Sequence, residues 1–149
     1  MRKTRVLFLC VGNTARSQMA EAFLRAYGGD GFEAQSAGLR PQEIDPLAIT
    51  VMQELGLDLR GHHAKHVKEL GGRLQFDYLI TVCNRAERMC PRFPGMGKRL
   101  SWPFEDPATF EGGEEERLAK YRQLRDGIER FIRAWLGELL SADSAARTR

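Results

Sequence analysis

The sequence predicts a single α/β domain built on a central parallel four-stranded sheet flanked by helices. Strand-like apolar runs alternate with helix-like stripes, and the first run is apolar on both faces, which is typical of a strand buried inside a parallel sheet. The chain has 149 residues, a length that usually makes one domain. We expect this domain to span residues 1–140 and a polar tail to follow over 141–149.

The first half of the chain predicts the order strand, helix, strand, helix. Arg5–Cys10 is the buried strand, and a helix begins at Ser17 and stops at Gly28-Gly29. Residues 32–37 form the second strand, and Asp45-Pro46 supplies an N-cap and a first-turn proline for a helix through Leu55. The first helix carries an apolar stripe of Met19, Phe23 and Tyr27.

The second half predicts two further strands and a long terminal helix. Residues 76–82 form the clearer strand, and residues 98–102 form a shorter one. In such a sheet, ligands bind beyond the carboxyl ends of the strands, and Cys10 and Cys83 each lie at such an end. The last helix is predicted by an apolar stripe at helical spacing, made of Leu118, Tyr121, Leu124, Ile128, Phe131, Ile132, Trp135 and Leu139.

Composition narrows the class of protein. Apolar residues make up 42% and charged residues 29% of the chain, and the net charge is +3. This balance is typical of a globular protein and does not indicate nucleic-acid binding. No segment reaches the roughly 20 apolar residues of a membrane span, and the basic start of the chain lacks a cleavage-like site. We therefore expect a cytoplasmic protein whose three cysteines begin as thiols. We also expect it to be a monomer.

The segment from Cys10 to Ser17 is the candidate active-site loop. A strand delivers the cysteine into a short loop that opens a helix, where unpaired backbone N–H groups favour a bound anion. Arg16 adds a guanidinium that holds two oxygens of a tetrahedral oxyanion. Gly12 lets the backbone approach closely, and Asn13 suits a left-handed turn. We therefore expect all eight residues to bind the substrate: Cys10, Val11, Gly12, Asn13, Thr14, Ala15, Arg16 and Ser17.

Cys10 is the candidate nucleophile. The loop amides, Arg16 and the Ser17 hydroxyl all favour a thiolate, and we expect them to lower the pKa of the thiol from about 8.5 toward roughly 6. The alternative is a structural cysteine at the end of a core strand, since free cysteines are among the most buried residues. The polar residues around Cys10 serve no core, so we favour catalysis.

Two more cysteines, Cys83 and Cys90, follow the strand over residues 76–82 at a spacing of seven positions. On a helix their Cα atoms stand roughly 10.5 Å apart, whereas a disulfide needs roughly 4.4–6.8 Å. The pair closes only if the segment unwinds, and we hypothesise a redox-driven rearrangement here. A zinc site is the alternative, but no tight ligand pair supports it. The other possible zinc ligands are His62, His63 and His66, which we expect to face solvent instead.

Asp106 is the candidate general acid. It lies in the turn Glu105-Asp106-Pro107 after the strand over residues 98–102, which aims a carboxyl group at the same edge of the sheet. A proton donor there assists a departing oxygen, typically by 10²- to 10⁴-fold. Asp-Pro is also common turn punctuation, so a structural role is the alternative.

Taken together, these motifs resemble the thioredoxin-coupled arsenate reductases, which share the fold of low-molecular-weight protein tyrosine phosphatases. The resemblance runs from about Arg5 to Trp135. The loop over residues 10–17 fits both families, whereas the segments from Cys83 to Pro91 and from Trp102 to Ala108 look like the reductase branch only.

The resemblance implies a role for each site residue. Cys10 would attack arsenate, and Asp106 would assist the loss of an oxygen. Cys83 would then attack the Cys10 adduct to release arsenite, and Cys90 would take over the disulfide, which thioredoxin reduces. Arg16 would bind the oxyanion. The resemblance implies arsenical resistance as the biological role, with no cofactor. Some members bind potassium beside the loop, but Lys65 stands where a carboxylate is expected, so we expect no metal and no potassium dependence.

Two other functions compete with this interpretation. A phosphatase acting on phosphotyrosine or small phosphate esters needs only Cys10, Arg16 and Asp106, through a cysteinyl-phosphate. It gains nothing from Cys83 and Cys90, so we expect phosphatase chemistry only as a slow side activity. A redox switch that responds to oxyanions without turnover is the non-enzymatic alternative, and no partner-binding module supports it.

Overall fold

The computed structural model describes residues 3–70, 75–83, 86, 88 and 97–147. Within them, four parallel strands form one sheet in the order β2-β1-β3-β4. The predicted parallel four-stranded sheet is therefore confirmed. Its strands are β1 (Thr4–Cys10), β2 (Phe32–Gly38), β3 (Tyr78–Thr81) and β4 (Lys98–Ser101).

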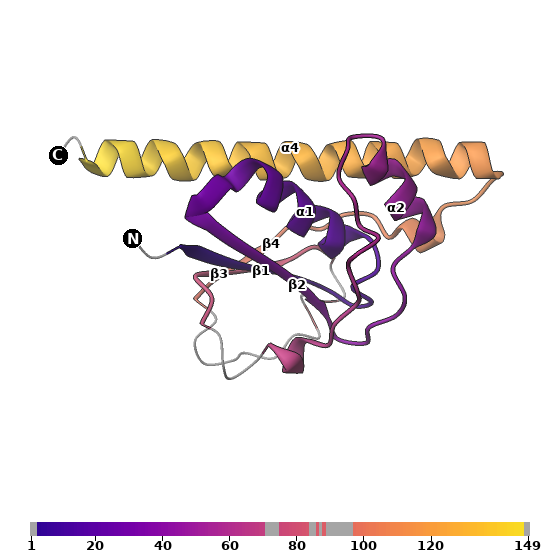
Figure 1. The fold of residues 1–149 in the computed structure, drawn as a ribbon, viewed down its shortest axis with the longest axis horizontal. Coiled ribbons are helices and arrows are strands. Elements are labelled where there is room, and N and C mark those ends of the chain that lie inside the picture. Colours follow the sequence, from indigo (N-terminus) through magenta and orange to yellow (C-terminus); the bar gives the residue numbers. More distant parts are fainter. Residues whose placement is uncertain (1–2, 71–74, 84–85, 87, 89–96, 148–149) are drawn as a thin grey trace.

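Strand β1 lies in the centre because its side chains are apolar in both directions. Residues Val6, Leu7, Phe8 and Leu9 are fully buried, two on each face of the sheet. The described α-helices cover the Phe8 face (Figure 1). On the Leu7 face, a smaller apolar cluster includes Val67 of the short 3₁₀ turn η2 (Val67–Glu69).

The α-helices whose bounds the structure describes are α1 (Arg16–Gly28), α2 (Pro46–Gln53) and α4 (Glu114–Arg147), and α1 packs on β1 and β2. Asp45 caps α2 as predicted, because its carboxylate accepts a hydrogen bond from the Leu47 amide at 2.9 Å. Helix α2 ends two residues before the predicted Leu55. Helix α4 begins with three glutamates, whose charges favour a helix N-terminus.

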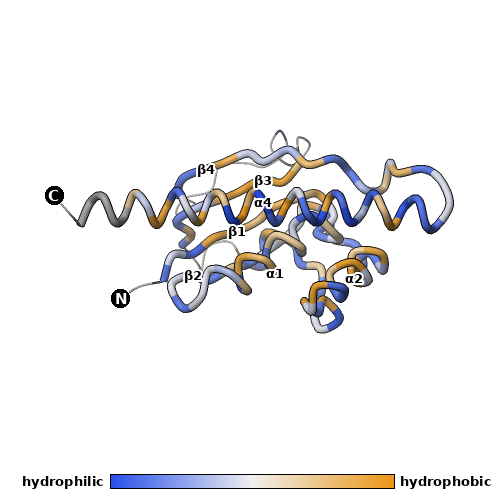
Figure 2. The backbone as a smooth tube through the Cα atoms, turned by 90° about the horizontal axis from the view of Figure 1, so that it is seen from above, coloured by the Kyte–Doolittle hydropathy of each residue, from blue (hydrophilic) through white to orange (hydrophobic). Residues whose placement is uncertain are grey.

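Helix α4 runs along the whole molecule and packs against α1 and α2 (Figure 2). It continues through Arg147, so the described part of the expected polar tail is helical. The boundary between a domain over residues 1–140 and a tail remains a prediction. None of the described helices is long and apolar enough to cross a membrane.

Two aromatic residues of the predicted apolar stripes are more exposed than their neighbours. Tyr27 is 40% exposed and Phe131 is 46% exposed. The Tyr27 hydroxyl donates a 2.6 Å hydrogen bond to Glu129, and the Arg133 guanidinium lies over its ring. Tyr27 therefore links α1 to α4 at the surface, where its hydroxyl needs a polar partner.

Candidate active site

The candidate loop joins the end of β1 to the start of α1. The chain after β2 forms hydrogen bonds with the carbonyl groups of this loop. Backbone N–H groups in residues 39–45 donate to the loop carbonyls at 2.8–3.3 Å. These bonds pair four loop carbonyls with the chain after β2, and the first N–H groups of α1 have no partner within the helix, which favours an anion at this end. The four pairs are Leu39 with Cys10, Arg40 with Val11, Gln42 with Gly12, and Asp45 with Thr14.

Gly38, the last residue of β2, permits this close approach. A Cβ atom at this position would lie 2.7 Å from the Val11 carbonyl oxygen and 3.0 Å from the Asn13 amide nitrogen. Any side chain would therefore push the loop away from β2. This role of Gly38 was not predicted, although a glycine at the carboxyl end of a strand is a signal for close backbone approach.

Asn13 holds the turn of the loop. Its φ angle is 54°, and Asn13 is the one non-glycine residue with positive φ in the described chain. The Asn13 amide donates a 3.1 Å hydrogen bond to the Cys10 sulfur, and its side-chain nitrogen donates to the Ser17 hydroxyl at 2.8 Å. The predicted left-handed turn is therefore present at Asn13. The Asn13 side chain also contacts Ser17, which lies beside the sulfur.

The Cys10 sulfur is buried, and this corrects the expected direction of its pKa. The residue is 2% exposed. Burial is the largest effect and raises the pKa of the Cys10 thiol, because the low-dielectric interior disfavours a thiolate. The Ser17 hydroxyl at 2.9 Å, the Arg16 charge and the amides of Ser17 and Asn13 oppose this rise. The predicted fall toward 6 is therefore wrong in direction.

Arg16 and Asp106 meet beside the loop, as the sequence predicts. Arg16 Nη1 donates a 3.1 Å hydrogen bond to the Phe104 carbonyl, and its Nη2 lies 3.8 Å from Asp106 Oδ1. The Arg16 side chain is 12% exposed, whereas that of Asp106 is 51% exposed. Asp106 Oδ1 also accepts from the Ala108 amide, so Asp106 caps the turn η3 (Pro107–Thr109) while it faces the loop. Both expected roles of Asp106 are compatible with this geometry.

Cys83 follows β3 at the same edge of the sheet as Cys10. The register pairs Thr81 of β3 with Leu9 of β1. Cys10 is the last residue of β1, and Cys83 lies two residues beyond the end of the neighbouring β3. Cys83 is 3% exposed, and its sulfur accepts a 3.3 Å hydrogen bond from the Ala86 amide. Cys90 lies outside the described residues, as does most of the segment predicted to unwind.

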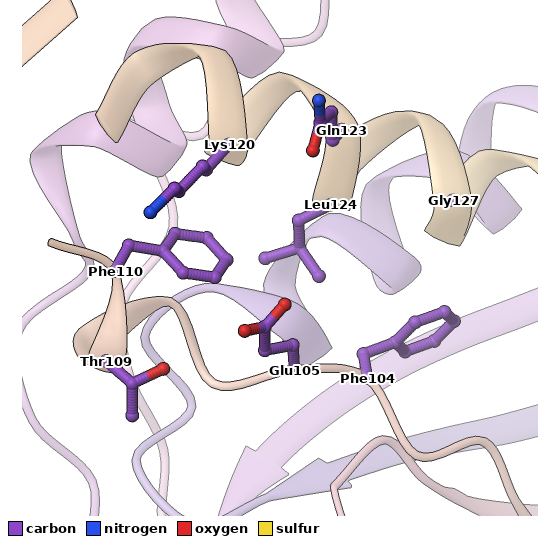
Figure 3. Close-up of a pocket in the computed structure, with 8 residues that line it drawn as sticks. All are labelled: Phe104, Glu105, Thr109, Phe110, Lys120, Gln123, Leu124 and Gly127. Carbon is purple, nitrogen blue, oxygen red and sulfur yellow. The ribbon is translucent and has the colours of Figure 1, made fainter. Parts of the chain in front are cut away.

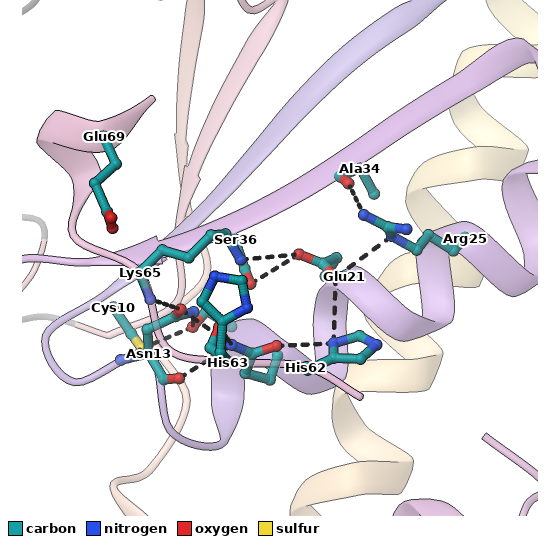
Figure 4. Close-up of polar contacts among 12 residues, drawn as sticks. Cys10, Asn13, Glu21, Arg25, Ala34, Ser36, His62, His63, Lys65 and Glu69 are labelled. Atoms are coloured by element: carbon teal, nitrogen blue, oxygen red, sulfur yellow. Dashed lines mark hydrogen bonds and ion pairs between the residues drawn. The ribbon is translucent and has the colours of Figure 1, made fainter. Parts of the chain in front are cut away.

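A buried carboxylate, Glu21, lies behind the loop among positive groups (Figure 4). Ser36 donates to it at 2.9 Å. Arg25 and His62 each lie 3.4 Å from one of its oxygens, and the Lys65 ammonium lies 3.9 Å from the other. A potassium ion does not fit here, because the oxygens already face donors and the ion would meet an ammonium group.

The histidines differ from the expectation that all three face solvent. His63 is exposed, but the side chain of His62 is 23% exposed and turns toward Glu21 (Figure 4). His66 caps η2 by accepting from the Lys68 amide. The described residues contain no group of three or more potential metal ligands.

A cavity of about 310 Å³ lies between the Asp106 loop and α4 (Figure 3). Phe104, Phe110 and Leu124 give it apolar walls, and Glu105 and Lys120 place opposite charges at its rim (Figure 3). It adjoins the segment that carries Asp106, and Cys10 does not line it. Cys10 therefore lies apart from this cavity.

Comparison with known proteins identifies the family. The model of the low molecular weight phosphotyrosine protein phosphatase family matches residues 5–145. The chain belongs to this family. Curated arsenate reductases are similar to this chain: that of Halalkalibacterium halodurans is 37% identical over 136 residues, which cover 91% of this chain and 96% of that protein.

Solved structures agree with this placement. An arsenate reductase in the phosphate binding state has a TM-score of 0.77 and 25% identity, over 91% of this chain and 98% of that one. A thioredoxin-dependent arsenate reductase of Corynebacterium glutamicum has a TM-score of 0.58 and 30% identity, over 89% of this chain and 63% of that one. The expected phosphatase-like fold is therefore confirmed.

Proposed function

We propose that this enzyme reduces arsenate to arsenite, with Cys10 as the nucleophile and with Cys83 and Cys90 as the thiols that complete a disulfide relay. One observation carries the proposal: a second buried thiol, Cys83, follows the strand next to the one that delivers Cys10. A phosphatase needs one thiol at this edge, whereas a two-electron reduction needs a second thiol. The named relatives support arsenate as the substrate.

In the first step, the oxyanion enters the loop and lies against the free amides and Arg16. The raised pKa of Cys10 means that the resting sulfur keeps its proton at neutral pH. The arsenate dianion is a base, and it takes this proton as it binds. The thiolate is then stabilised by the Ser17 hydroxyl and the Asn13 amide.

In the second step, the Cys10 sulfur attacks arsenic. Thiolate, H₂AsO₄⁻ and one proton give a sulfur-arsenic adduct, RS-AsO₃H⁻, and water. Asp106 supplies that proton to the departing oxygen, from a position 3.8 Å from Arg16. Arg16 meanwhile neutralises charge on the oxygens that remain.

In the third step, the Cys83 thiol attacks the Cys10 sulfur. The sulfur-sulfur bond forms, the sulfur-arsenic bond breaks, and the electron pair leaves with arsenic as H₂AsO₃⁻. Arsenic is reduced by two electrons while Cys10 and Cys83 are oxidised. Cys90 then displaces Cys10 from the disulfide, and a dithiol reductant restores the Cys83 and Cys90 thiols.

Thioredoxin is the proposed reductant, supported by the thioredoxin-dependent reductase among the similar structures. Such a relay operates where thiols are kept reduced, so we propose that the enzyme acts in the cytoplasm. We also propose that it is a monomer. The family model favours a second activity, slow hydrolysis of phosphate esters, since Arg16 and Asp106 already meet beside the nucleophile.

Arsenate-dependent NADPH oxidation with thioredoxin and thioredoxin reductase tests the proposal. Wild type turns over, and Cys10→Ser, Cys83→Ser and Cys90→Ser do not. The three variants differ in phosphatase activity, which Cys83→Ser and Cys90→Ser retain and Cys10→Ser loses. Full arsenate turnover by Cys83→Ser would disprove the relay, and full turnover by Cys10→Ser would disprove the nucleophile.

A further inference from the structure

Gln18, in the first turn of α1, is a fully buried polar side chain that the proposed chemistry does not use. Its amide nitrogen donates to the Asn13 carbonyl at 3.2 Å, to Asn13 Oδ1 at 3.0 Å and to the His63 carbonyl at 3.2 Å. Its amide oxygen lies 3.0 Å from His62 Nδ1. One side chain therefore joins α1, the oxyanion loop and the segment before η2.

These contacts fix which way the Gln18 amide points. Backbone carbonyls only accept hydrogen bonds, so the nitrogen of Gln18 must face the carbonyls of Asn13 and His63. The oxygen must then face His62, and it accepts a hydrogen bond there. His62 consequently carries a proton on Nδ1, which also lies 3.4 Å from a Glu21 oxygen.

The orientation of the Asn13 side-chain amide is fixed in the same way. The Lys65 backbone N–H donates to Asn13 Oδ1 at 2.9 Å, and a backbone amide cannot accept. Asn13 Nδ2 must therefore face the Ser17 hydroxyl, which accepts from it at 2.8 Å. The Ser17 hydroxyl keeps its own hydrogen, and a thiolate at Cys10, 2.9 Å away, is the acceptor for that hydrogen.

We infer that Gln18 is a positioning residue: it connects His62 to Asn13, so that the hydrogen bonds from His62 to the Cys10 sulfur run in one direction and end on the thiolate. His62 donates to Gln18, Gln18 to Asn13, Asn13 to Ser17, and Ser17 to Cys10. Hydrogen bonds in such a chain polarise one another, so the last donor binds an anion more strongly than an isolated hydroxyl does.

This role rests on the proposed function only through Cys10 as nucleophile. The series of hydrogen bonds from His62 to Cys10 offsets part of the effect of burial, which raises the pKa of the Cys10 thiol. Charged and titratable groups lie at both ends of this series of hydrogen bonds. Those near the Cys10 sulfur are Arg16, Asp106 and Cys83. Those near His62 are Glu21, Arg25 and Lys65.

The test measures the rate of iodoacetamide alkylation of Cys10 against pH, followed at the Cys10 peptide by mass spectrometry. Gln18→Met keeps the length of the side chain but removes its hydrogen bonds, and Gln18→Glu keeps the oxygen that faces His62 but removes the donor to Asn13. In both variants we expect the alkylation midpoint to rise by about one pH unit, a tenfold loss of thiolate below the midpoint.

Met19→Ala is the matched control, because Met19 is the next residue of α1, is fully buried and lies outside the chain of hydrogen bonds. It lowers stability and leaves the midpoint at the wild-type value. Wild-type midpoints in both Gln18 variants would overturn the inference. So would a Met19→Ala midpoint that rises as much as theirs.

A second measurement uses the wild-type protein alone. Nitrogen-15 NMR of the neutral His62 ring is expected to show the proton on Nδ1, and a proton on Nε2 alone would overturn the direction of the chain. Neither measurement contains arsenate. Failure of arsenate turnover therefore contradicts the proposed function and leaves the inference about Gln18 standing.

Discussion

The Ser17 hydroxyl lies 2.9 Å from the Cys10 sulfur. This contact joins the last residue of β1 to the first turn of α1 across the loop. Both residues are buried, and the hydroxyl already accepts a hydrogen bond from Asn13. Ser17 is therefore the side-chain donor that opposes the cost of a buried thiolate. The proposed nucleophile, Cys10, therefore relies on Ser17 to offset part of the burial that raises its pKa.

Replacing Ser17 by alanine tests this dependence. A hydrogen bond to a charged group contributes about 1.5–3 kcal/mol, so kcat/KM for arsenate is expected to fall about tenfold to a hundredfold. The Cys10 alkylation midpoint rises in parallel. Thr50→Ala removes a hydroxyl that donates to the Pro46 carbonyl on α2, away from the site, and serves as the control. A Ser17→Ala enzyme with wild-type kcat/KM would contradict the assignment.

The local elements of this fold are predictable from the sequence because they depend on neighbours along the chain. The apolar run of β1, the Asp45-Pro46 start of α2 and the stripe of α4 each lie where the sequence predicts. The loop from Cys10 to Ser17 was predictable for the same reason, since strand, loop and helix follow one another without a gap.

The parts that were not predicted depend on contacts between distant segments. The carbonyls of the loop bond to residues 39–45, and Gly38 lets the two segments approach. The raised pKa of Cys10 follows from burial, which no local pattern reports. Gln18 looked like an ordinary polar helix residue, and only its four contacts show its place beneath the loop.

Replacing Asp106 by asparagine separates proton donation from capping. The asparagine oxygen still accepts from the Ala108 amide, so the melting temperature is expected to stay near that of wild type. The proton for the departing oxygen is lost, and kcat is expected to fall by about 10²-fold with little change in KM. Glu105→Gln, at the adjacent residue, is the control and keeps kcat. An unchanged kcat in Asp106→Asn would exclude Asp106 as the acid.

Glu54 contributes stability that depends on pH. The hydrogen bonds of Arg122, together with those of Arg125, lower the pKa of Glu54 to about 2 from its ordinary value of 4.5. A lowered pKa stabilises the folded state above the ordinary value, and this contribution is lost as the pH falls toward about 2. The contact joins α2 to α4.

Urea unfolding of wild type and Glu54→Gln measures this contribution. The pair is partly exposed, so at pH 7 the variant is expected to be about 1 kcal/mol less stable. The two free energies of unfolding should converge as the solution is acidified. A difference that stayed constant between neutral and acid pH would show that the charge of Glu54 is not its cause.

Because Lys65 occupies the site beside Glu21, we expect potassium to have no specific effect on stability. Its ammonium lies 3.9 Å from Glu21, where an added cation would be repelled. Melting temperatures in KCl and NaCl at equal ionic strength should therefore agree. Lys65→Asp places a second carboxylate there, and we expect potassium to stabilise that variant. A higher melting temperature of wild type in KCl than in NaCl would contradict the role given to Lys65.

The most direct test of the account is a single turnover without any external reductant. The fully reduced enzyme is mixed with excess arsenate, and released arsenite and remaining thiols are counted. Wild type is expected to release about one arsenite per chain and to lose two of its three thiols. Cys10→Ser is expected to release none and to keep its thiols. Arsenite release by Cys10→Ser, or none by wild type, would contradict the central role of the Cys10 sulfur.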